Sequence, residues 1–194
     1  MNRRTLTLSL LALGASASLG LTGCGFHMRH PPTMAFKSIQ LVGFAANSPL
    51  AAELARALED SGVTVVDSTA AAAALAAPTG ASGAAALQSP LQSHVVLEAL
   101  SDQREESVAS TTAFGQVREM SLRTRFRFQL AHADGSAVIP PIELVLNHDL
   151  SYNEKDALAK MDESTALHRA MQTDIVGQVM RRLAVVRPDQ LAPR

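Results

Sequence analysis

The sequence predicts an α+β domain in which two helices pack on one face of a mixed sheet of about four strands. A strand–helix–strand pattern spans residues 36–66, and three extended segments follow over residues 95–150. About thirty residues with helical periodicity begin at Glu154. Each helix has one apolar stripe to bury, and one sheet face can cover both stripes. We therefore expect a two-layer sandwich formed by residues 34–186.

The first helix has clear start and stop signals. Residues 36–43 form a short strand that ends at Gly43. Ser48 suits the N-cap and Pro49 the first helical position, while Gly62 suits a left-handed cap after the helix. The apolar stripe consists of Leu50, Leu54 and Leu58, four residues apart. Residues 63–66 form the next strand.

Residues 68–93 are a low-complexity segment. They contain a run of alanines followed by several Gly and Ser and by two prolines. Alanine favours helix, but the segment has almost no large apolar side chain to bury. We expect a mobile surface insertion in the domain, since such tracts seldom carry chemistry.

The clearest strand lies around residues 120–130, after a long strand over 95–111 and a turn near Phe114. Apolar residues alternate there with polar ones, so one face is core and the other carries a row of arginines. The core positions are Met120, Leu122, Phe126, Phe128 and Leu130, and the row is Arg123, Arg125 and Arg127.

The next strand, residues 142–150, allows a register prediction. Asp134-Gly135 indicates a two-residue hairpin turn. Such a loop alone sets Phe128 opposite Pro141 and places core positions opposite solvent positions. One bulge residue at Pro140-Pro141, where the ladder lacks two N–H donors, shifts the register by one residue and sets core positions opposite core positions again. The expected pairs are Phe126 with Leu144, Arg127 with Glu143 and Phe128 with Ile142.

The second helix begins after residues 151–154, which have capping-box spacing, with Asn153 as a competing N-cap. Pro188 ends the regular structure, and we expect a disordered tail over 187–194. The expected apolar face consists of Leu158, Met161, Leu167, Met171, Ile175, Val176, Val179, Met180 and Leu183.

Residues 1–23 read as an export signal that ends at the only cysteine. Arg3 and Arg4 precede an apolar run, and the segment closes on Leu21-Thr22-Gly23-Cys24, which looks like a bacterial lipobox. The alternatives are an ordinary signal with a free thiol or a transmembrane anchor. The run is shorter than the roughly 20 residues of a spanning helix, and a lone thiol has no partner for a disulfide.

We therefore expect lipidation at Cys24 and a tether over residues 24–33, which Pro31 and Pro32 keep extended. Position 25 is Gly rather than Asp. By resemblance to bacterial lipoproteins, this indicates transfer to the outer membrane, where the chain is held by its lipid on the periplasmic side.

Composition and motifs argue against several classes of function. The signal holds two of the 17 basic residues, so 15 remain against 18 acidic ones, unlike the basic field of a nucleic-acid binder. We find none of the nucleophile, zinc, phosphate-loop or dinucleotide motifs. We therefore expect no enzyme, no cofactor apart from the covalent lipid, and no metal site.

The histidines do not change this expectation. His27 and His30 lie in the tether without a third ligand. We expect His94, His132, His148 and His168 on strand edges or helix surfaces. A lipid-anchored hydrolase is an alternative that would need a serine beside His148-Asp149.

The row Arg123, Arg125 and Arg127 is the feature that suggests function. One interpretation is a solvated face neutralised by nearby acids such as Glu143, since exposed ion pairs are common and nearly neutral in energy. The other is binding of a protein or a phosphate, because guanidinium groups bind such oxygens in pairs.

Three stretches resemble the family of the lipopolysaccharide-assembly lipoprotein LptE, and the resemblance covers most of the mature chain. They are Gly-Cys-Gly-Phe-His-Met-Arg at 23–29, Asp-Leu-Ser-Tyr-Asn-Glu at 149–154 leading to Ala-Leu-Ala-Lys at 157–160, and the ending from Asp174-Ile175 to Arg181-Arg182-Leu183. The resemblance implies an outer-membrane lipoprotein that plugs the LptD β-barrel and helps it to fold. Together they place lipopolysaccharide in the outer leaflet, without catalysis.

The resemblance also assigns residues. The basic residue that contacts lipopolysaccharide corresponds to Lys160, whose alternative role is that of a solvated helix lysine. A second basic contact is absent from the matching loop, residues 113–116, and Arg118 is the nearest substitute. The arginine row would meet the polar inside of the barrel or a lipid phosphate. The alternative function is a free periplasm-facing lipoprotein that binds another amphiphile or peptidoglycan.

Overall fold

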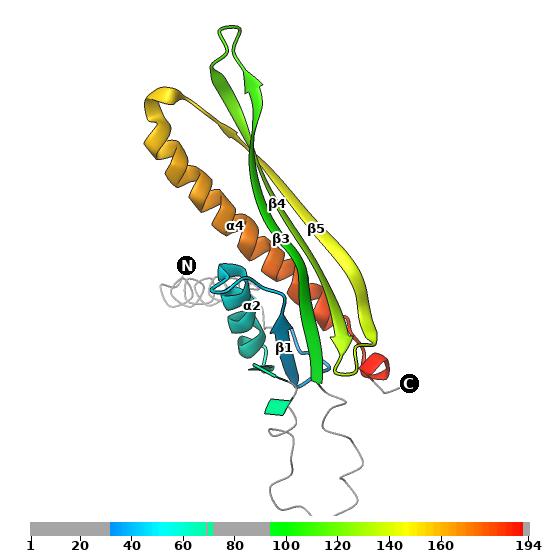
Figure 1. The fold of residues 1–194 in the computed structure, drawn as a ribbon. Coiled ribbons are helices and arrows are strands. Elements are labelled where there is room, and N and C mark those ends of the chain that lie inside the picture. Colours follow the sequence, from blue (N-terminus) through cyan, green and yellow to red (C-terminus); the bar gives the residue numbers. More distant parts are fainter. Residues whose placement is uncertain (1–31, 69, 72–93, 192–194) are drawn as a thin grey trace, which may run out of the picture. The chain divides into compact units, whose positions relative to one another are not determined.

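A computed structural model describes residues 32–68, 70–71 and 94–191 (Figure 1). The expected signal peptide, Cys24 and nearly all of the tether lie outside these residues. So does the expected insertion, apart from residues 68, 70 and 71. The described residues belong to one compact unit.

One sheet of five strands forms the first layer. Its strands are β1 (Ser38–Val42), β2 (Thr64–Val66), β3 (His94–Thr111), β4 (Val117–His132) and β5 (Ala137–Ser151), in the order β2-β1-β3-β4-β5. β1 runs parallel to both neighbours, and the other pairs are antiparallel. The α+β prediction is confirmed, with five strands rather than about four because the short β2 also joins the sheet.

Two helices, α2 (Pro49–Asp60) and α4 (Ala157–Ala184), form the second layer. Ser48 caps α2 as predicted, since its hydroxyl accepts a hydrogen bond from the Ala51 N–H at 3.3 Å. A 3₁₀ turn, η4 (Glu154–Asp156), precedes α4. Asn153, rather than Ser151 of the capping box, caps this turn, since its Oδ1 accepts a hydrogen bond from the Lys155 N–H at 3.1 Å.

The core lies between the helices and one sheet face. It contains the three α2 leucines, Phe126, Phe128 and Leu130 of β4, and Ile175, Val179 and Leu183 of α4. Burial contributes roughly 1.5–3 kcal/mol for each such side chain, against about 0–1 kcal/mol for an exposed ion pair. The core therefore dominates the stability of the fold.

The prediction of a disordered tail over 187–194 is wrong for the residues up to Leu191. Residues Pro188–Leu191 form a 3₁₀ turn, η5, and Leu191 is buried in the core with Val186. The His132 ring nitrogen Nε2 also lies 3.1 Å from the Gln190 carbonyl oxygen. An apolar side chain that reaches the core orders the chain beyond Pro188.

The register prediction for β4 and β5 is confirmed at all three pairs, and the ladder shifts between Phe128–Ile142 and Leu130–Ile139, at the two prolines. The predicted two-residue turn is wrong. The His132 N–H donates to the Ser136 carbonyl at 2.8 Å, so three residues form the loop. A second shift, between Leu130 and Ala131, compensates for the longer loop.

Gly43 sets how closely β1 approaches β3. Its φ of +79° is in the left-handed region, and a Cβ there would clash with the Ala99 carbonyl oxygen. A side chain at this position would therefore push the two strands apart. β3 has a bulge at the same place, between Ala99 and Ser101.

Two histidines are buried, contrary to the surface positions that we expected. His168 is 9% exposed, and His94 is fully buried, with its Nδ1 3.0 Å from the Ser38 hydroxyl. His94 Nε2 has no hydrogen-bond partner among the described residues. Burial lowers the pKa of His94, an effect that the Ser38 hydrogen bond partly offsets.

His94 should make folding sensitive to mild acid. Below about pH 6.5 the unfolded chain protonates this ring while the folded chain resists, so the free energy of unfolding falls by at most about 1.4 kcal/mol per pH unit. In urea unfolding between pH 8 and pH 5, His94→Asn should lose less stability than the wild type. Parallel pH curves for the two proteins would contradict this.

Candidate functional site

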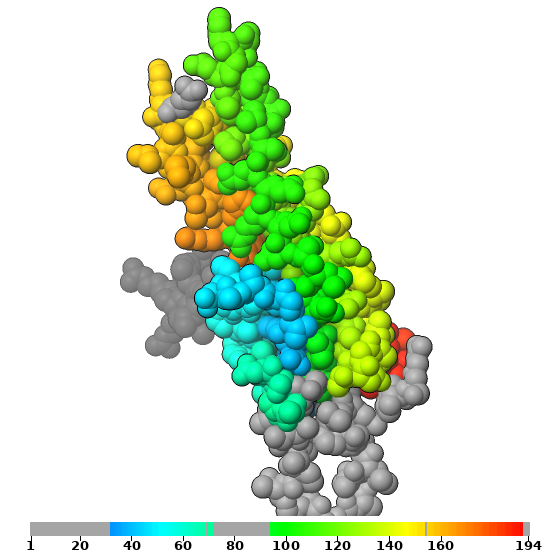
Figure 2. Space-filling view, viewed as in Figure 1, coloured from blue at the N-terminus to red at the C-terminus, as the bar shows by residue number. Residues whose placement is uncertain are grey.

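The predicted basic residues fall in two places. Lys160 and Arg118 lie at the end of the domain where β5 ends and α4 begins, which we call the distal end. The Tyr152 N–H donates to the Arg118 carbonyl at 2.8 Å and joins the two segments there. In Figure 2 the β3–β4 hairpin (green) and the start of α4 (yellow to orange) share this end. The arginine row lies elsewhere, on the sheet face opposite the core.

Lys160 borders a small apolar cavity of about 170 Å³ at the distal end. Its Nζ donates to Glu163 at 2.8 Å and to the Ser151 hydroxyl at 3.3 Å, and its side chain is 19% exposed. The other lining residues are Glu106, Met120, Leu150, Tyr152, Met161, Ser164 and Thr165. The cavity thus places one cation beside apolar side chains, as a binding site for an anionic amphiphile requires.

A second distal cavity, of about 320 Å³, holds Arg118. It is lined by Thr112, Gln116, Val117, Arg118, Tyr152, Asn153 and Lys155, so Tyr152 borders both cavities. We did not predict Tyr152 or Lys155. The sequence does contain a feature that points to Lys155: Asn153 as a cap fixes where Lys155 lies relative to the end of β5.

The distal end also exposes apolar side chains. Of the seven large apolar side chains exposed in the described residues, four belong to this end: Val108, Phe114, Leu158 and Met161, which are 53%, 92%, 81% and 65% exposed. We expected Leu158 and Met161 to begin the core face of the helix. Both are exposed, and β3 presents the polar side chain of Glu106 to Ser164 and His168 in this half of α4.

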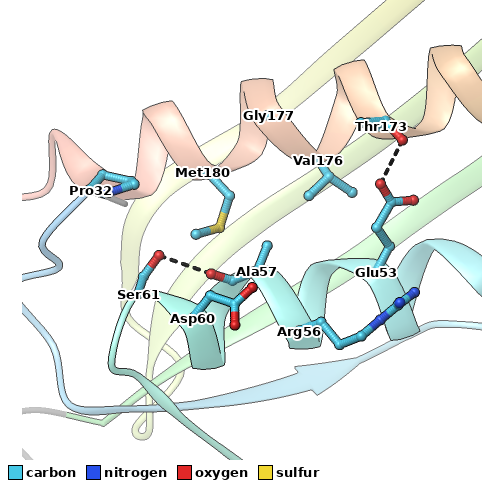
Figure 3. Close-up of a pocket in the computed structure, with 10 residues that line it drawn as sticks. All are labelled: Pro32, Glu53, Arg56, Ala57, Asp60, Ser61, Thr173, Val176, Gly177 and Met180. Carbon is cyan, nitrogen blue, oxygen red and sulfur yellow. Dashed lines mark hydrogen bonds between the residues drawn. The ribbon is translucent and has the colours of Figure 1, made fainter. Parts of the chain in front are cut away.

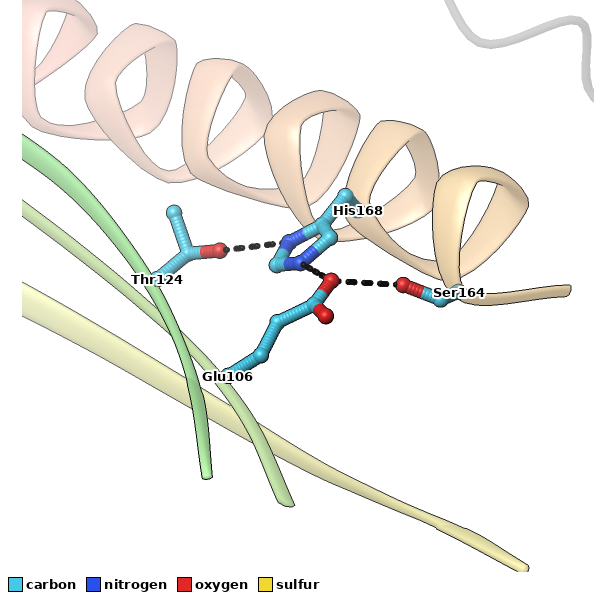
Figure 4. A network of polar contacts seen from close by, with 4 residues as sticks. All are labelled: Glu106, Thr124, Ser164 and His168. Atoms are coloured by element: carbon cyan, nitrogen blue, oxygen red, sulfur yellow. Dashed lines mark hydrogen bonds and ion pairs between the residues drawn. The ribbon is translucent and has the colours of Figure 1, made fainter. Parts of the chain in front are cut away.

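A polar network replaces the core beneath the first half of α4 (Figure 4). Glu106 Oε1 accepts from the Ser164 hydroxyl at 2.7 Å and lies 3.1 Å from His168 Nε2. The other ring nitrogen of His168 lies 3.5 Å from the Thr124 hydroxyl. These bonds satisfy Thr124 and His168, the two buried side chains of the network.

A second polar chain links β3 to both helices. Arg104 donates to Gln172 Oε1 at 2.6 Å, and the Gln172 amide donates to Glu53 of α2 at 2.5 Å. Nearby, burial raises the pKa of Asp102, and the charge of Arg104 opposes that shift. Hydrogen bonds therefore hold α4 from Ser164 to Gln172, and apolar side chains from Ile175 to Leu183 pack in the core.

The groove between α2 and α4 has a volume of about 490 Å³ (Figure 3). Ala57, Val176 and Met180 form its apolar part, and Glu53 accepts from the Thr173 hydroxyl at 2.7 Å across it. None of the basic residues predicted from the sequence lines this groove.

The arginine row is only partly neutralised. Arg125 pairs with Glu105 at 3.1 Å, and Arg123 Nε donates to Asn147 at 2.9 Å. Arg127 lies opposite Glu143 as predicted, yet no ion pair joins them in the part of the chain that the structure describes. This face therefore offers charges of both signs.

The alternative of a hydrolase finds no support at His148-Asp149. The two residues are consecutive in β5 and both are exposed, so their side chains point to opposite faces of the sheet. Among the described residues, no cluster of three His, Cys, Asp or Glu side chains could hold a metal. No described helix is long and apolar enough to cross a membrane.

The family model described as LptE, lipopolysaccharide-assembly, matches residues 36–183. The chain belongs to this family. The match includes all five strands, nearly all of both helices and the five basic residues named above. LptE proteins take part in lipopolysaccharide assembly, and the family is not a catalytic one. No curated protein matches the chain at a significant level.

Solved structures share the fold. A lipoprotein B from Nitrosomonas europaea matches with a TM-score of 0.60 and 22% identity, over 82% of this chain and 90% of that one. The rare lipoprotein B from Shewanella oneidensis matches with 0.58 and 20%, over 76% and 94%. A minor lipoprotein from Acinetobacter baumannii matches with 0.56 and 17%, over 77% and 91%. At these identities the likeness concerns the fold alone.

Two adjacent acids of β3 test the polar network. Glu106→Ala removes the acceptor of Ser164 and His168 and should lower the free energy of unfolding by about 1–2 kcal/mol. Glu105→Ala, its matched control on the open face, removes one exposed ion pair and should cost at most about 0.5 kcal/mol. Urea unfolding measures both, and equal losses would contradict a specific role for the network.

Proposed function

We propose that this protein is an outer-membrane lipoprotein that plugs the LptD β-barrel and binds lipopolysaccharide during its insertion into the outer leaflet. The observation that carries the proposal is the family match over residues 36–183. The geometry of the distal end and of the open sheet face supports a separate role for each.

The distal end suits an anionic amphiphile. Lys160 lies beside an apolar cavity, Arg118 lines the neighbouring one, and exposed Leu158 and Met161 lie close to Lys160 along the helix. Lipopolysaccharide carries phosphates and acyl chains, so it requires both kinds of contact. A cation that binds phosphate contributes a charge-assisted hydrogen bond, which is stronger than a neutral one.

The open sheet face suits the inside of a barrel. Large outer-membrane barrels have polar interiors, and this face presents Arg123, Arg125 and Arg127 among acidic and amide side chains. An obligate interface with the barrel should bury well above about 2,000 Å². A wide sheet face that no described helix covers can supply a large part of such an area.

The lipid anchor holds the domain at the outer membrane, where the LptD β-barrel and lipopolysaccharide are found. Acylation of Cys24 follows from the lipobox, and each buried methylene contributes about 0.8 kcal/mol to membrane binding. Several acyl chains on one cysteine hold the protein to the leaflet, where one chain alone would bind only weakly.

Co-purification tests the plug. The chain extracted from outer membranes in detergent should carry a stoichiometric β-barrel partner. Replacing Arg123, Arg125 and Arg127 together with Gln should lower the yield of the barrel, because the interface loses three sets of donors. A lone monomer in the wild type would favour the free lipoprotein, and unchanged barrel and lipopolysaccharide binding in the variant would remove the arginine row from the proposal.

Lys160→Gln tests the ligand site. It should weaken lipopolysaccharide binding about tenfold, which corresponds to about 1.4 kcal/mol, and leave the barrel in place. Lys37→Gln, an exposed lysine before β1, is the matched control. Binding assays with immobilised lipopolysaccharide give the comparison, and equal affinities would make Lys160 a solvated helix lysine.

A further inference from the structure

Two exposed apolar side chains lie on the strands that flank the arginine row. Val145 of β5 is 42% exposed and pairs with Arg125 in the ladder, so its side chain shares the face of the arginines. Leu100 is 40% exposed and is the extra residue of the β3 bulge, directly before Ser101, whose ladder partner is Arg127. Leu100 and Val145 therefore lie in the strands on either side of Arg127.

The polar side chains of β4 directly before and after Arg127 on this face are bonded across the sheet. Arg125 pairs with Glu105 of β3 at 3.1 Å. Gln129 Nε2 donates to Glu98 Oε2 of β3 at 2.6 Å. The donors of both side chains are thus engaged within the domain, and a partner that displaced Glu105 or Glu98 would gain little net binding energy.

Arg127 differs from these neighbours. It lies directly opposite Glu143 of β5, and both side chains are exposed. Within the described part of the chain, neither takes part in an ion pair. The guanidinium can therefore give two parallel donors to a carboxylate of a partner, and the Glu143 carboxylate can accept a donor from the same partner.

We propose that Leu100, Arg127, Glu143 and Val145 form the centre of a protein-binding surface, which we call the central patch. Its partner presents a carboxylate to Arg127 and a hydrogen-bond donor to Glu143, with apolar side chains around them. A few residues supply most of the binding energy of a protein interface. Arginine is prominent among them, and near-neutral polar contacts around them exclude water. The bonded side chains on either side of Arg127 form part of such a rim.

A protein fits the central patch better than a phosphate group does. The Glu143 carboxylate opposite Arg127 repels a phosphate that approaches the guanidinium. A protein surface can instead present charges of both signs side by side, and its apolar side chains can pack on Leu100 and Val145. The inference deepens the proposed function, on which it rests for the identity of the partner, by naming the chemistry that the inner wall of the barrel must offer.

A charge swap tests the central patch at constant net charge. Arg127→Glu/Glu143→Arg exchanges the two unpaired charges and so sets like charges opposite those of the partner. We expect the amount of barrel that co-purifies with the full-length chain from outer membranes to fall at least about fivefold. The matched control, Arg125→Glu/Glu105→Arg, exchanges a pair that is bonded within the sheet and should keep nearly the wild-type amount. Urea unfolding of both variants checks that the fold is retained.

Site-specific cross-linking identifies the partner without relying on the yield. The photoreactive amino acid p-benzoylphenylalanine replaces Leu100 or Val145 in the otherwise wild-type chain, and mass spectrometry identifies the cross-linked protein. We expect both positions to cross-link to the barrel in outer membranes. Adding the Arg127→Glu/Glu143→Arg swap should remove these cross-links, and adding the Arg125→Glu/Glu105→Arg swap should preserve them.

The outcomes separate the central patch from the proposed function. A wild-type amount of barrel in the Arg127→Glu/Glu143→Arg variant, or equal losses in the two swaps, would overturn the central patch and leave the barrel as the partner. Cross-links to a different protein that only this swap removes would support the central patch and refute the barrel. If neither Leu100 nor Val145 cross-links to any protein, the central patch is wrong, whether or not the barrel co-purifies.

Discussion

The stacking of Phe126 and Phe128 on β4 is the interaction on which the rest of the domain depends. Their ring centroids lie 5.5 Å apart, Phe44 stacks on Phe126 at 5.9 Å, and both β4 rings are completely buried. With these even positions in the core, the pleat sends the odd positions to the opposite face. The arginine row is therefore a consequence of how the core is packed, and a one-residue slip would exchange the two faces.

Sequence reasoning succeeded where one local signal decides the structure. The alternation in β4, the Ser48-Pro49 helix start and the diproline bulge each have one dominant physical cause, and the structure agrees with all three. The helix stripe beginning at Leu158 was wrong because periodicity shows that a face is apolar but does not show what lies beneath it. The loop of the β4–β5 hairpin was wrong because a second bulge allows one more residue there.

The candidate site was predictable only in part. Lys160 and Arg118 come from a family resemblance, and nothing in their local sequence shows that each borders a cavity. Lys155 and Tyr152 join them through the packing of the β5 end against β4, a contact between residues more than thirty positions apart. The burial of His94 and His168 likewise depends on distant partners, which periodicity alone does not identify.

The two prolines of β5 also determine what can join the sheet. β5 is an edge strand of 15 residues, and such an edge can pair with strands of other chains. Pro140 and Pro141 lack the N–H groups that a new strand would need, and the bulge bends the edge beside them. The same feature that aligns Phe128 with Ile142 thus also protects one end of the exposed edge against pairing with other chains.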